Sequence, residues 1–218
     1  MRHRTHHFVS PRFTHVKLEP PFFRDVVDVF EDRMKYWFIG PAKLLLGAEH
    51  GEVAAVALTM PYFEGIEIYL SGEDSKGRSR EFFMRGFRRV FPGFTGPEYL
   101  YERVASGLYE SLRCGFAHDA MFRHGIYFSD VRKEPFTLTW PKKNGEYDLE
   151  GQLESAIVNP RSFVEGVERH FQNYVRELKA VGESEIKKKF QAAADVKWHL
   201  LSRERSIGLT EEEFYGAA

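Results

Sequence analysis

The chain has 218 residues, of which 43% are hydrophobic and 29% charged. This composition is typical of a folded globular protein and excludes a disordered one. Its formal net charge of −1 excludes a global basic field that would attract nucleic acid, so any such ligand must be held by a local patch. The single cysteine, Cys114, excludes an internal disulfide and is typical of a reducing compartment. We therefore expect a cytoplasmic protein with one domain.

The start of the chain predicts neither a targeting signal nor a metal site. Residues 1–13 are basic but lack the apolar run of a secretory signal. Residues 1–19 carry several histidines without helical period, and no set of carboxylates or cysteines completes a metal site there. We expect a flexible arm over residues 1–19, no metal and no cofactor. The longest mostly apolar stretch, Val53–Phe63, is too short to span a bilayer, so no membrane partner is expected.

The periodicity of the apolar residues predicts a helical bundle over residues 20–218. The first helix is expected to open at Pro20-Pro21 and to end at Gly40-Pro41. A second long helix is expected over Glu52–Leu70, with a kink at Pro61 because proline removes one backbone donor. Further helices are expected over residues 78–91, 98–115, 160–179 and 184–205.

Between residues 125 and 149 the spacing of the apolar residues changes from a helical period to alternation. Gly125–Ser129 and Pro135–Trp140 alternate and are rich in β-branched and aromatic residues, and five residues separate them, so they predict a hairpin. A third strand near Tyr147–Leu149 is expected to follow the Asn144-Gly145 turn. The predicted fold is mostly α: one helical bundle with a small β-hairpin insert around residues 125–149.

One predicted helix carries a row of arginines opposite its phenylalanines. The row comprises Arg78, Arg85, Arg88 and Arg89. Such a row is either a solvated helix face or a track for a phosphate backbone. The planar fork of arginine matches phosphate oxygens, and this favours the second interpretation.

The helix expected over residues 98–115 carries a polar stripe beside its buried one. The stripe comprises Glu102, Ser106, Tyr109 and Arg113. We expect this helix to end near Gly115, which places Arg113 and His118 together at the mouth of a helix end. Two interpretations stay open: the pair caps a helix C-terminus, where cations are favourable, or it forms a phosphate site with a base.

The segment Arg113-Cys-Gly-Phe-Ala-His118 resembles the motif of the HEPN superfamily (higher eukaryotes and prokaryotes nucleotide-binding). In that motif an arginine is followed by four to six residues and then by a histidine near a helix junction. The resemblance covers chiefly residues 52–124, with the later helices as bundle partners. It implies a helical bundle that acts as a homodimeric, metal-independent endoribonuclease on RNA, in a toxin or defence role with a neutralising partner protein. Other members bind or assemble without catalysis, and Cys114, where active members commonly carry a polar residue, favours that alternative.

The residues themselves suit RNA cleavage through the ribose 2′-hydroxyl. This chemistry needs a base that removes a proton and a cation that holds the developing negative charge. Histidine side chains exchange protons near neutral pH, so His118 is the candidate base. Arg113 is the candidate phosphate ligand, with Glu102 or Tyr109 to orient it. The chain contains no GxxxxGK[ST] loop, GxSxG turn or HExxH helix, so the commoner hydrolase signatures are excluded.

Overall fold

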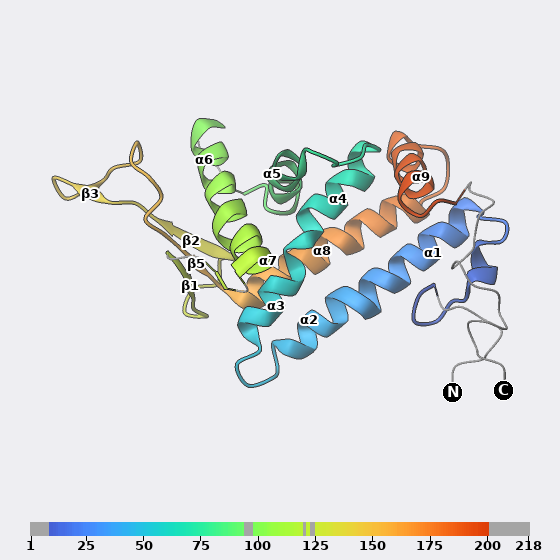
Figure 1. Ribbon diagram of the computed structural model, residues 1–218, viewed down its shortest axis with the longest axis horizontal. Coiled ribbons are helices and arrows are strands. Elements are labelled where there is room, and N and C mark those ends of the chain that lie inside the picture. The colour runs from blue at the N-terminus through green and yellow to red at the C-terminus, as the bar shows by residue number, and fades with distance from the viewer. Residues whose placement is uncertain (1–8, 94–97, 120, 123–124, 201–218) are drawn as a thin grey trace.

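Two long helical segments, α1 (Phe23–Arg33) with its continuation and α8 (Pro160–Lys179), lie side by side along the body of the molecule (Figure 1). The computed structural model describes residues 9–93, 98–119, 121–122 and 125–200. These residues are mostly helical with a small sheet, as the sequence predicts. The remaining helical elements are η1 (His15–Leu18), η2 (Met34–Ile39), α2 (Gly40–Leu45), α3 (Glu52–Thr59), α4 (Pro61–Ser71), α5 (Ser79–Val90), α6 (Glu98–Leu108), η3 (Tyr109–Cys114), α7 (Gly115–Asp119) and α9 (Glu185–Lys197).

The first helix does not end at Gly40-Pro41, so that prediction is wrong. α1 passes through the π-helical segment η2 into α2, and Pro41 lies in the first turn of α2. The N–H of Gly40 donates to the carbonyl of Lys35, five residues back. A π turn widens the helix locally, and this absorbs a proline that would otherwise clash with the preceding turn.

The helical run through α3 and α4 begins at Glu52, as expected, and is interrupted only by a turn at Met60. Pro61 is tolerated there because it occupies the first turn of α4, where a backbone N–H has no partner within the helix. The run Glu52–Ser71 has 20 residues with a mean hydropathy of 1.3. Among the described residues, it alone is long and apolar enough to cross a membrane by length and composition, and half of it is buried in the protein.

Aromatic side chains from α4, α5 and α8 form a cluster within the core. Phe63 lies at its centre, with its ring centroid 5.2 to 5.9 Å from those of four other phenylalanines: Phe83, Phe87, Phe91 and Phe163. Such edge-on and tilted contacts stabilise beyond the area that they bury. The helix expected over 160–179 is confirmed as α8, and the side chain of Asn159 caps it by accepting a hydrogen bond from the N–H of Ser162. α9 ends at Lys197, and the part of its predicted range beyond residue 200 lies outside the described residues.

The described part of the N-terminal arm lies against α1. Arg12 contacts the carboxylate of Asp32 at 2.5 Å, and Asp32 is completely buried. Burial raises the pKa of Asp32, but hydrogen bonds from Ser10 and Arg12 outweigh that effect and bring it below its usual value. The Nε of Arg33 also donates to the carbonyl of Val9 at 2.5 Å. Residues 9–18 are therefore docked, and residues 1–8 of the predicted flexible arm lie outside the described residues.

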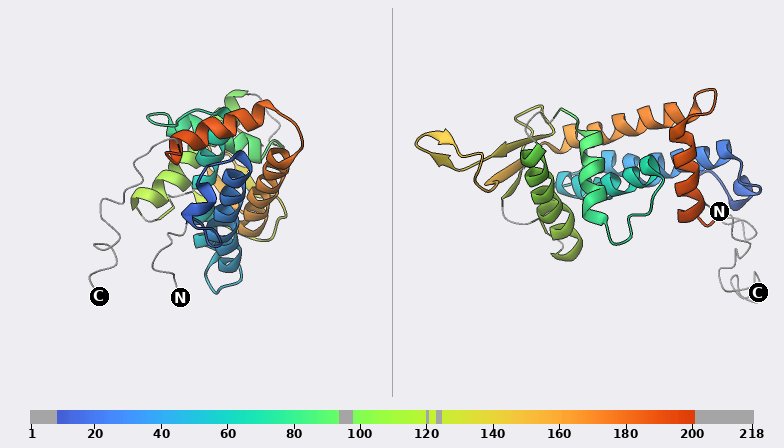
Figure 2. Two further views of the ribbon diagram at one scale, coloured as in Figure 1. Left: turned by 90° about the vertical axis from the view of Figure 1, so that its right-hand side faces the viewer. Right: turned by 90° about the horizontal axis from the view of Figure 1, so that it is seen from above.

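The strand segments exist, but they do not form the predicted hairpin. β1 (Ile126–Phe128) and β2 (Phe136–Thr139) are not neighbours, because β5 (Ser155–Val158) lies between them. β5 pairs parallel with β1 and antiparallel with β2. A separate hairpin of β3 (Lys142–Lys143) and β4 (Glu146–Tyr147) turns at Asn144-Gly145, both of which have positive φ, and it projects away from the body (Figure 2).

Candidate active site at Arg113 and His118

The helix that carries the candidate residues does not end at Gly115, so this part of the prediction is wrong. α6, η3 and α7 form one continuous helical run from Glu98 to Asp119. Within it, the N–H of Gly115 donates to the carbonyl of Glu110, five residues back, as in a π-helix. The sequence has no proline between residues 98 and 134, so proline does not account for η3 as it accounts for η2. Single π turns inside α-helices occur frequently at functional sites.

Arg113 lies in this π segment and turns toward α4. Its Nη2 lies 3.5 Å from a carboxylate oxygen of Glu64, and 30% of its side chain is exposed. Charge-assisted hydrogen bonds are usually 2.7–2.9 Å long, so this contact positions the guanidinium without saturating it. The other oxygen of Glu64 accepts a hydrogen bond of 2.8 Å from the hydroxyl of Ser75. Glu64 thus contacts Arg113 with one carboxylate oxygen, and Ser75, in the loop after α4, fixes the other.

Tyr109 supports Arg113 from within the same segment. The guanidinium carbon of Arg113 lies 5.8 Å from the centroid of the Tyr109 ring. The Tyr109 ring packs edge-on against Phe83 of α5, with centroids 5.2 Å apart. Burial, followed by a hydrogen bond with Cys114, raises the pKa of Tyr109. Tyr109 therefore contacts Arg113 through its ring and stays protonated at neutral pH.

His118 lies on α7 with an exposed side chain. Within the described part of the chain it makes no hydrogen bond or ion pair, and no contact joins it to Arg113. The structure therefore places both residues on one helix but does not bring them together in a single subunit. Two apolar side chains within three residues of His118 in the sequence are also exposed: Phe116 and Met121.

The other two members of the predicted stripe do not reach Arg113. Ser106 accepts a hydrogen bond from Arg80 of α5, which also lies 3.4 Å from Glu110. Glu102 is exposed and has no ion pair among the described residues. The carboxylate that orients Arg113 is Glu64, which sequence reasoning missed. The available signal was a charged residue inside an otherwise apolar helix, a placement that usually requires a partner.

The predicted arginine row on α5 is largely neutralised. Arg85 and Arg89 both contact Glu67 of α4, at 2.7 and 2.6 Å, and Glu67 is completely buried beneath them. Arg78 contacts Glu73 at 2.8 Å. Arg88 lies over the ring of Tyr101, with its guanidinium carbon 4.7 Å from the centroid. The row exists as predicted, but three of its four members face carboxylates that precede α5 in the chain.

A half-buried histidine lies next to this row. The Nδ1 of His170, on α8, is 2.8 Å from the hydroxyl of Tyr62. Burial, with a smaller contribution from the nearby charge of Arg89, lowers the pKa of His170 to about 4. The imidazole is neutral at physiological pH and joins α8 to α4 through its hydrogen bond with Tyr62, so we assign it a structural role.

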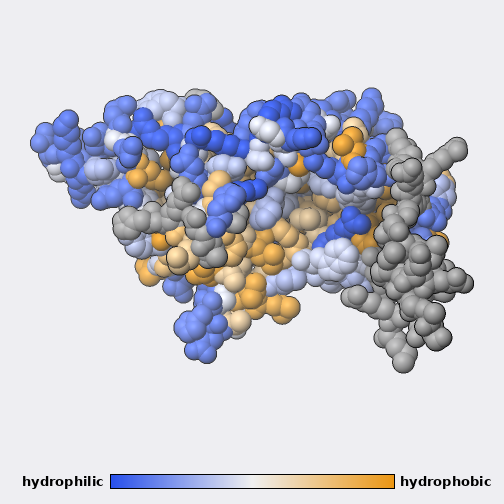
Figure 3. Space-filling model, in the orientation of Figure 1, coloured by the Kyte–Doolittle hydropathy of each residue, from blue (hydrophilic) through white to orange (hydrophobic). Residues whose placement is uncertain are grey.

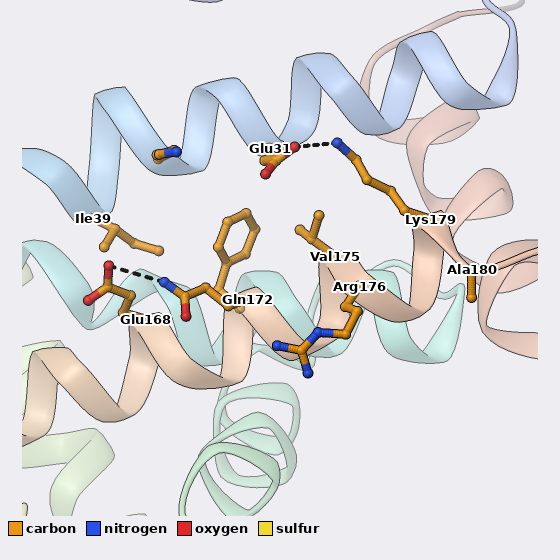
Figure 4. Close-up of a pocket in the computed structure, with 10 residues that line it drawn as sticks. Glu31, Ile39, Glu168, Gln172, Val175, Arg176, Lys179 and Ala180 are labelled. Atoms are coloured by element: carbon orange, nitrogen blue, oxygen red, sulfur yellow. Dashed lines mark hydrogen bonds and ion pairs between the residues drawn. The ribbon is translucent and has the colours of Figure 1, made fainter.

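A hollow of about 640 Å³ lies elsewhere, between α1 with η2 and α8. Figure 4 shows Glu31 reaching Lys179 across it and Glu168 contacting Gln172. Its described lining contains no histidine or cysteine, so it offers no acid–base or nucleophilic group comparable to His118. No group of three or more potential metal ligands occurs among the described residues.

Comparison with known proteins finds no matching family model, no similar curated protein and no similar solved structure.

Proposed function

We propose that the chain is a metal-independent endoribonuclease of HEPN type, in which Arg113 and His118 cleave RNA through the ribose 2′-hydroxyl. The observation that carries this proposal is the π segment Tyr109–Cys114, which no proline explains. It holds Arg113 partly exposed, on the same helical run as the exposed His118. Glu64 and Tyr109 restrain the guanidinium from two sides and leave part of its donor fork available to a phosphate.

The reaction is an intramolecular transfer within the RNA. The imidazole of His118 removes the 2′-hydroxyl proton while the 2′-oxygen forms a bond to phosphorus and the bond from phosphorus to the 5′-oxygen breaks. Arg113 donates hydrogen bonds to the phosphate oxygens, where negative charge accumulates in the transition state. The leaving 5′-oxygen takes a proton from the imidazolium of the second subunit. The products are a 2′,3′-cyclic phosphate and a 5′-hydroxyl.

A homodimer accounts for the separation of Arg113 and His118 within one subunit. Arg113 and His118 make no contact in one subunit, so a two-fold axis along the Glu98–Arg113 helix supplies the second histidine and a second phosphate ligand. The exposed apolar side chains near His118 suit such an interface, because single subunits rarely leave large apolar patches uncovered.

Removal of either group tests the proposal. Mixed RNA is incubated with the protein and excess EDTA, and the products are sequenced from their cyclic-phosphate ends. Arg113→Ala and His118→Ala are each expected to lower the cleavage rate by about 10²-fold or more, because one loses charge stabilisation and the other the base. Arg24→Ala and His50→Ala, at exposed positions on α1 and in the loop after α2, are matched controls that keep full activity. Equal cleavage by all five proteins, or cleavage that stops with EDTA, contradicts the proposal.

The contact between Arg113 and Glu64 favours a second candidate, a non-catalytic helical module that binds a partner protein or RNA. In that case the guanidinium serves chiefly to join η3 to α4. Fluorescence anisotropy with a labelled single-stranded RNA separates the two candidates: the module binds RNA or a protein without producing cyclic phosphate ends, and His118→Ala leaves its affinity unchanged.

A further inference from the structure

The hollow between the α1–η2 segment and α8 has the size and the floor of a small-molecule site. Its volume of about 640 Å³ falls within the range of about 300–1,000 Å³ that is usual for ligand pockets. Its floor is apolar and consists of Ile39, Phe171 and Val175, which are only 3 to 5% exposed. Figure 4 shows Ile39 and Val175 pointing into the space between the two helices. The hollow can therefore take up the apolar part of a ligand.

Ion pairs between the two helices mark both ends of the hollow. At one end the Nζ of Lys179 lies 2.5 Å from a carboxylate oxygen of Glu31. At the other end the Nζ of Lys43 lies 2.8 Å from a carboxylate oxygen of Glu168. The two helices therefore run antiparallel along the hollow. Because Glu31 and Glu168 are the carboxylates of its described lining, both negative charges that line it are already paired with lysine.

Two cations without a carboxylate partner line the hollow, one on each wall. Lys35 lies on η2, one turn beyond Glu31, and Arg176 lies on α8, one turn before Lys179. Both side chains are exposed, and neither forms an ion pair among the described residues. Arg176 donates one hydrogen bond of 3.1 Å to the side-chain oxygen of Asn173, and this leaves most of its donor fork available. Since the helices are antiparallel, both cations belong to the same end of the hollow.

Charge and apolar surface are therefore separated along the hollow. From the two cations the apolar floor continues toward Lys43, which lies eight residues or about 12 Å of helix beyond Lys35. In the space-filling view, apolar side chains gather over α2 and α3, the elements next to the Lys43 end (Figure 3). An anion with its charge at one end of an aliphatic chain matches this arrangement. Arginine and lysine donate charge-assisted hydrogen bonds to a carboxylate, and the chain is removed from water on the apolar floor.

We propose that this hollow binds a medium-chain aliphatic carboxylate. Lys35 and Arg176 hold the carboxylate from opposite walls, and the chain lies over Val175, Phe171 and Ile39. The bound carboxylate thereby joins η2 to α8 at a point where no ion pair of the described residues does so. The inference is independent of the proposed ribonuclease activity.

Isothermal titration calorimetry of the full chain with decanoate, below the concentration at which it forms micelles, tests the proposal. Decanol has the same chain without the charge, and acetate has the charge without the chain. We expect decanoate to bind at least about tenfold more tightly than either, because each of the other two lacks one of the two contacts. Lys35→Gln and Arg176→Gln are each expected to weaken the binding of decanoate about tenfold, because each removes a charged donor.

Arg161→Gln and Lys188→Gln are the matched controls, at exposed positions on α8 and α9 that do not line the hollow. They remove the same charges and are expected to keep the parent affinity. Thermal unfolding of all four variants shows that each is folded, which is expected because every substituted side chain is exposed and without an ion pair among the described residues. The proposal is overturned if decanoate does not bind, if decanol binds as tightly, or if either Lys35→Gln or Arg176→Gln leaves the affinity unchanged.

Discussion

Glu64 and Glu67 lie one helical turn apart on α4, and each faces arginine, but the two contacts have different consequences. Glu67 is fully buried and has two arginines over it at 2.6 and 2.7 Å. A carboxylate buried in this way must be paired, so Arg85 and Arg89 are committed to it. Glu64 is partly exposed and approaches Arg113 at 3.5 Å. The guanidinium of Arg113 is therefore less tightly paired than those of Arg85 and Arg89.

Sequence reasoning found the arginines but not their carboxylates. The row on α5 is visible as a helical period, whereas its partner Glu67 lies on α4 and meets it only when α4 packs on α5. Glu64 likewise meets Arg113 only where η3 approaches α4. The predicted partners of Arg113 came from its own helix for the same reason. Of these, Tyr109 is confirmed as a contact, and Glu102 lies apart.

His170 makes the stability of the protein depend on pH. Its pKa in the folded protein is about 4, below the ordinary value of 6.5, because burial disfavours the imidazolium. Between these two values the unfolded chain binds a proton that the folded protein does not, so stability falls as the pH falls from about 6.5 to about 4. The loss is about 3 kcal/mol over this interval.

Urea unfolding from pH 7 to pH 4.5 measures this effect, with His170→Gln as the comparison. Glutamine can still bond to the hydroxyl of Tyr62 but does not titrate, so the difference between the two curves removes the contribution of the carboxylates. We expect the parent to lose stability relative to the variant throughout this range. If the stabilities of the parent and of His170→Gln change in parallel with pH, then His170 does not cause the pH dependence.

At the scale of the elements, the crossing of α4 and α5 depends on one glycine. Gly86 allows α5 to approach the backbone of Phe63, since a Cβ there would lie 1.9 Å from its carbonyl oxygen. Gly86→Ala is expected to lower the free energy of unfolding by about 3 kcal/mol through overpacking. Gly65→Ala, on the open side of α4, is expected to raise it by about 1 kcal/mol through helix propensity. Thermal or urea unfolding measures both, and an equal effect of the two substitutions is the result that contradicts this account.

The helices α5 and α8 were predictable from sequence because a strong apolar period coincides with clear boundary residues. The prediction failed where a π turn replaced a helix end, at Gly40-Pro41 and at Gly115. Glycine and proline indicate local preference only, and packing along the rest of the helix overrode it. β5 was missed because four residues, Ser155–Val158, carry too short an alternation to stand out.

At the scale of the whole molecule, the expected dimer depends on the surface around α7. Phe116 is 39% exposed and Met121 70% exposed near the end of the helical run that begins at Glu98. Phe116→Asp places a charge in the proposed interface. We expect the parent to be dimeric in light scattering and the variant monomeric, with RNA cleavage reduced about 10²-fold, because the second histidine is lost. A parent that is monomeric and still cleaves RNA contradicts the dimer.

The order of the sheet, β1-β5-β2, determines when this end of the molecule can form during synthesis. The ribosome releases β1 and β2 first, and neither can pair until β5 has emerged behind them. In that interval both strands present bare edges, which are prone to mispairing with other chains. A nascent chain stalled before Val158 therefore carries the helices from α1 to α7 without the completed sheet and without α8 and α9, and its unpaired strands are open to mispairing at this stage of translation.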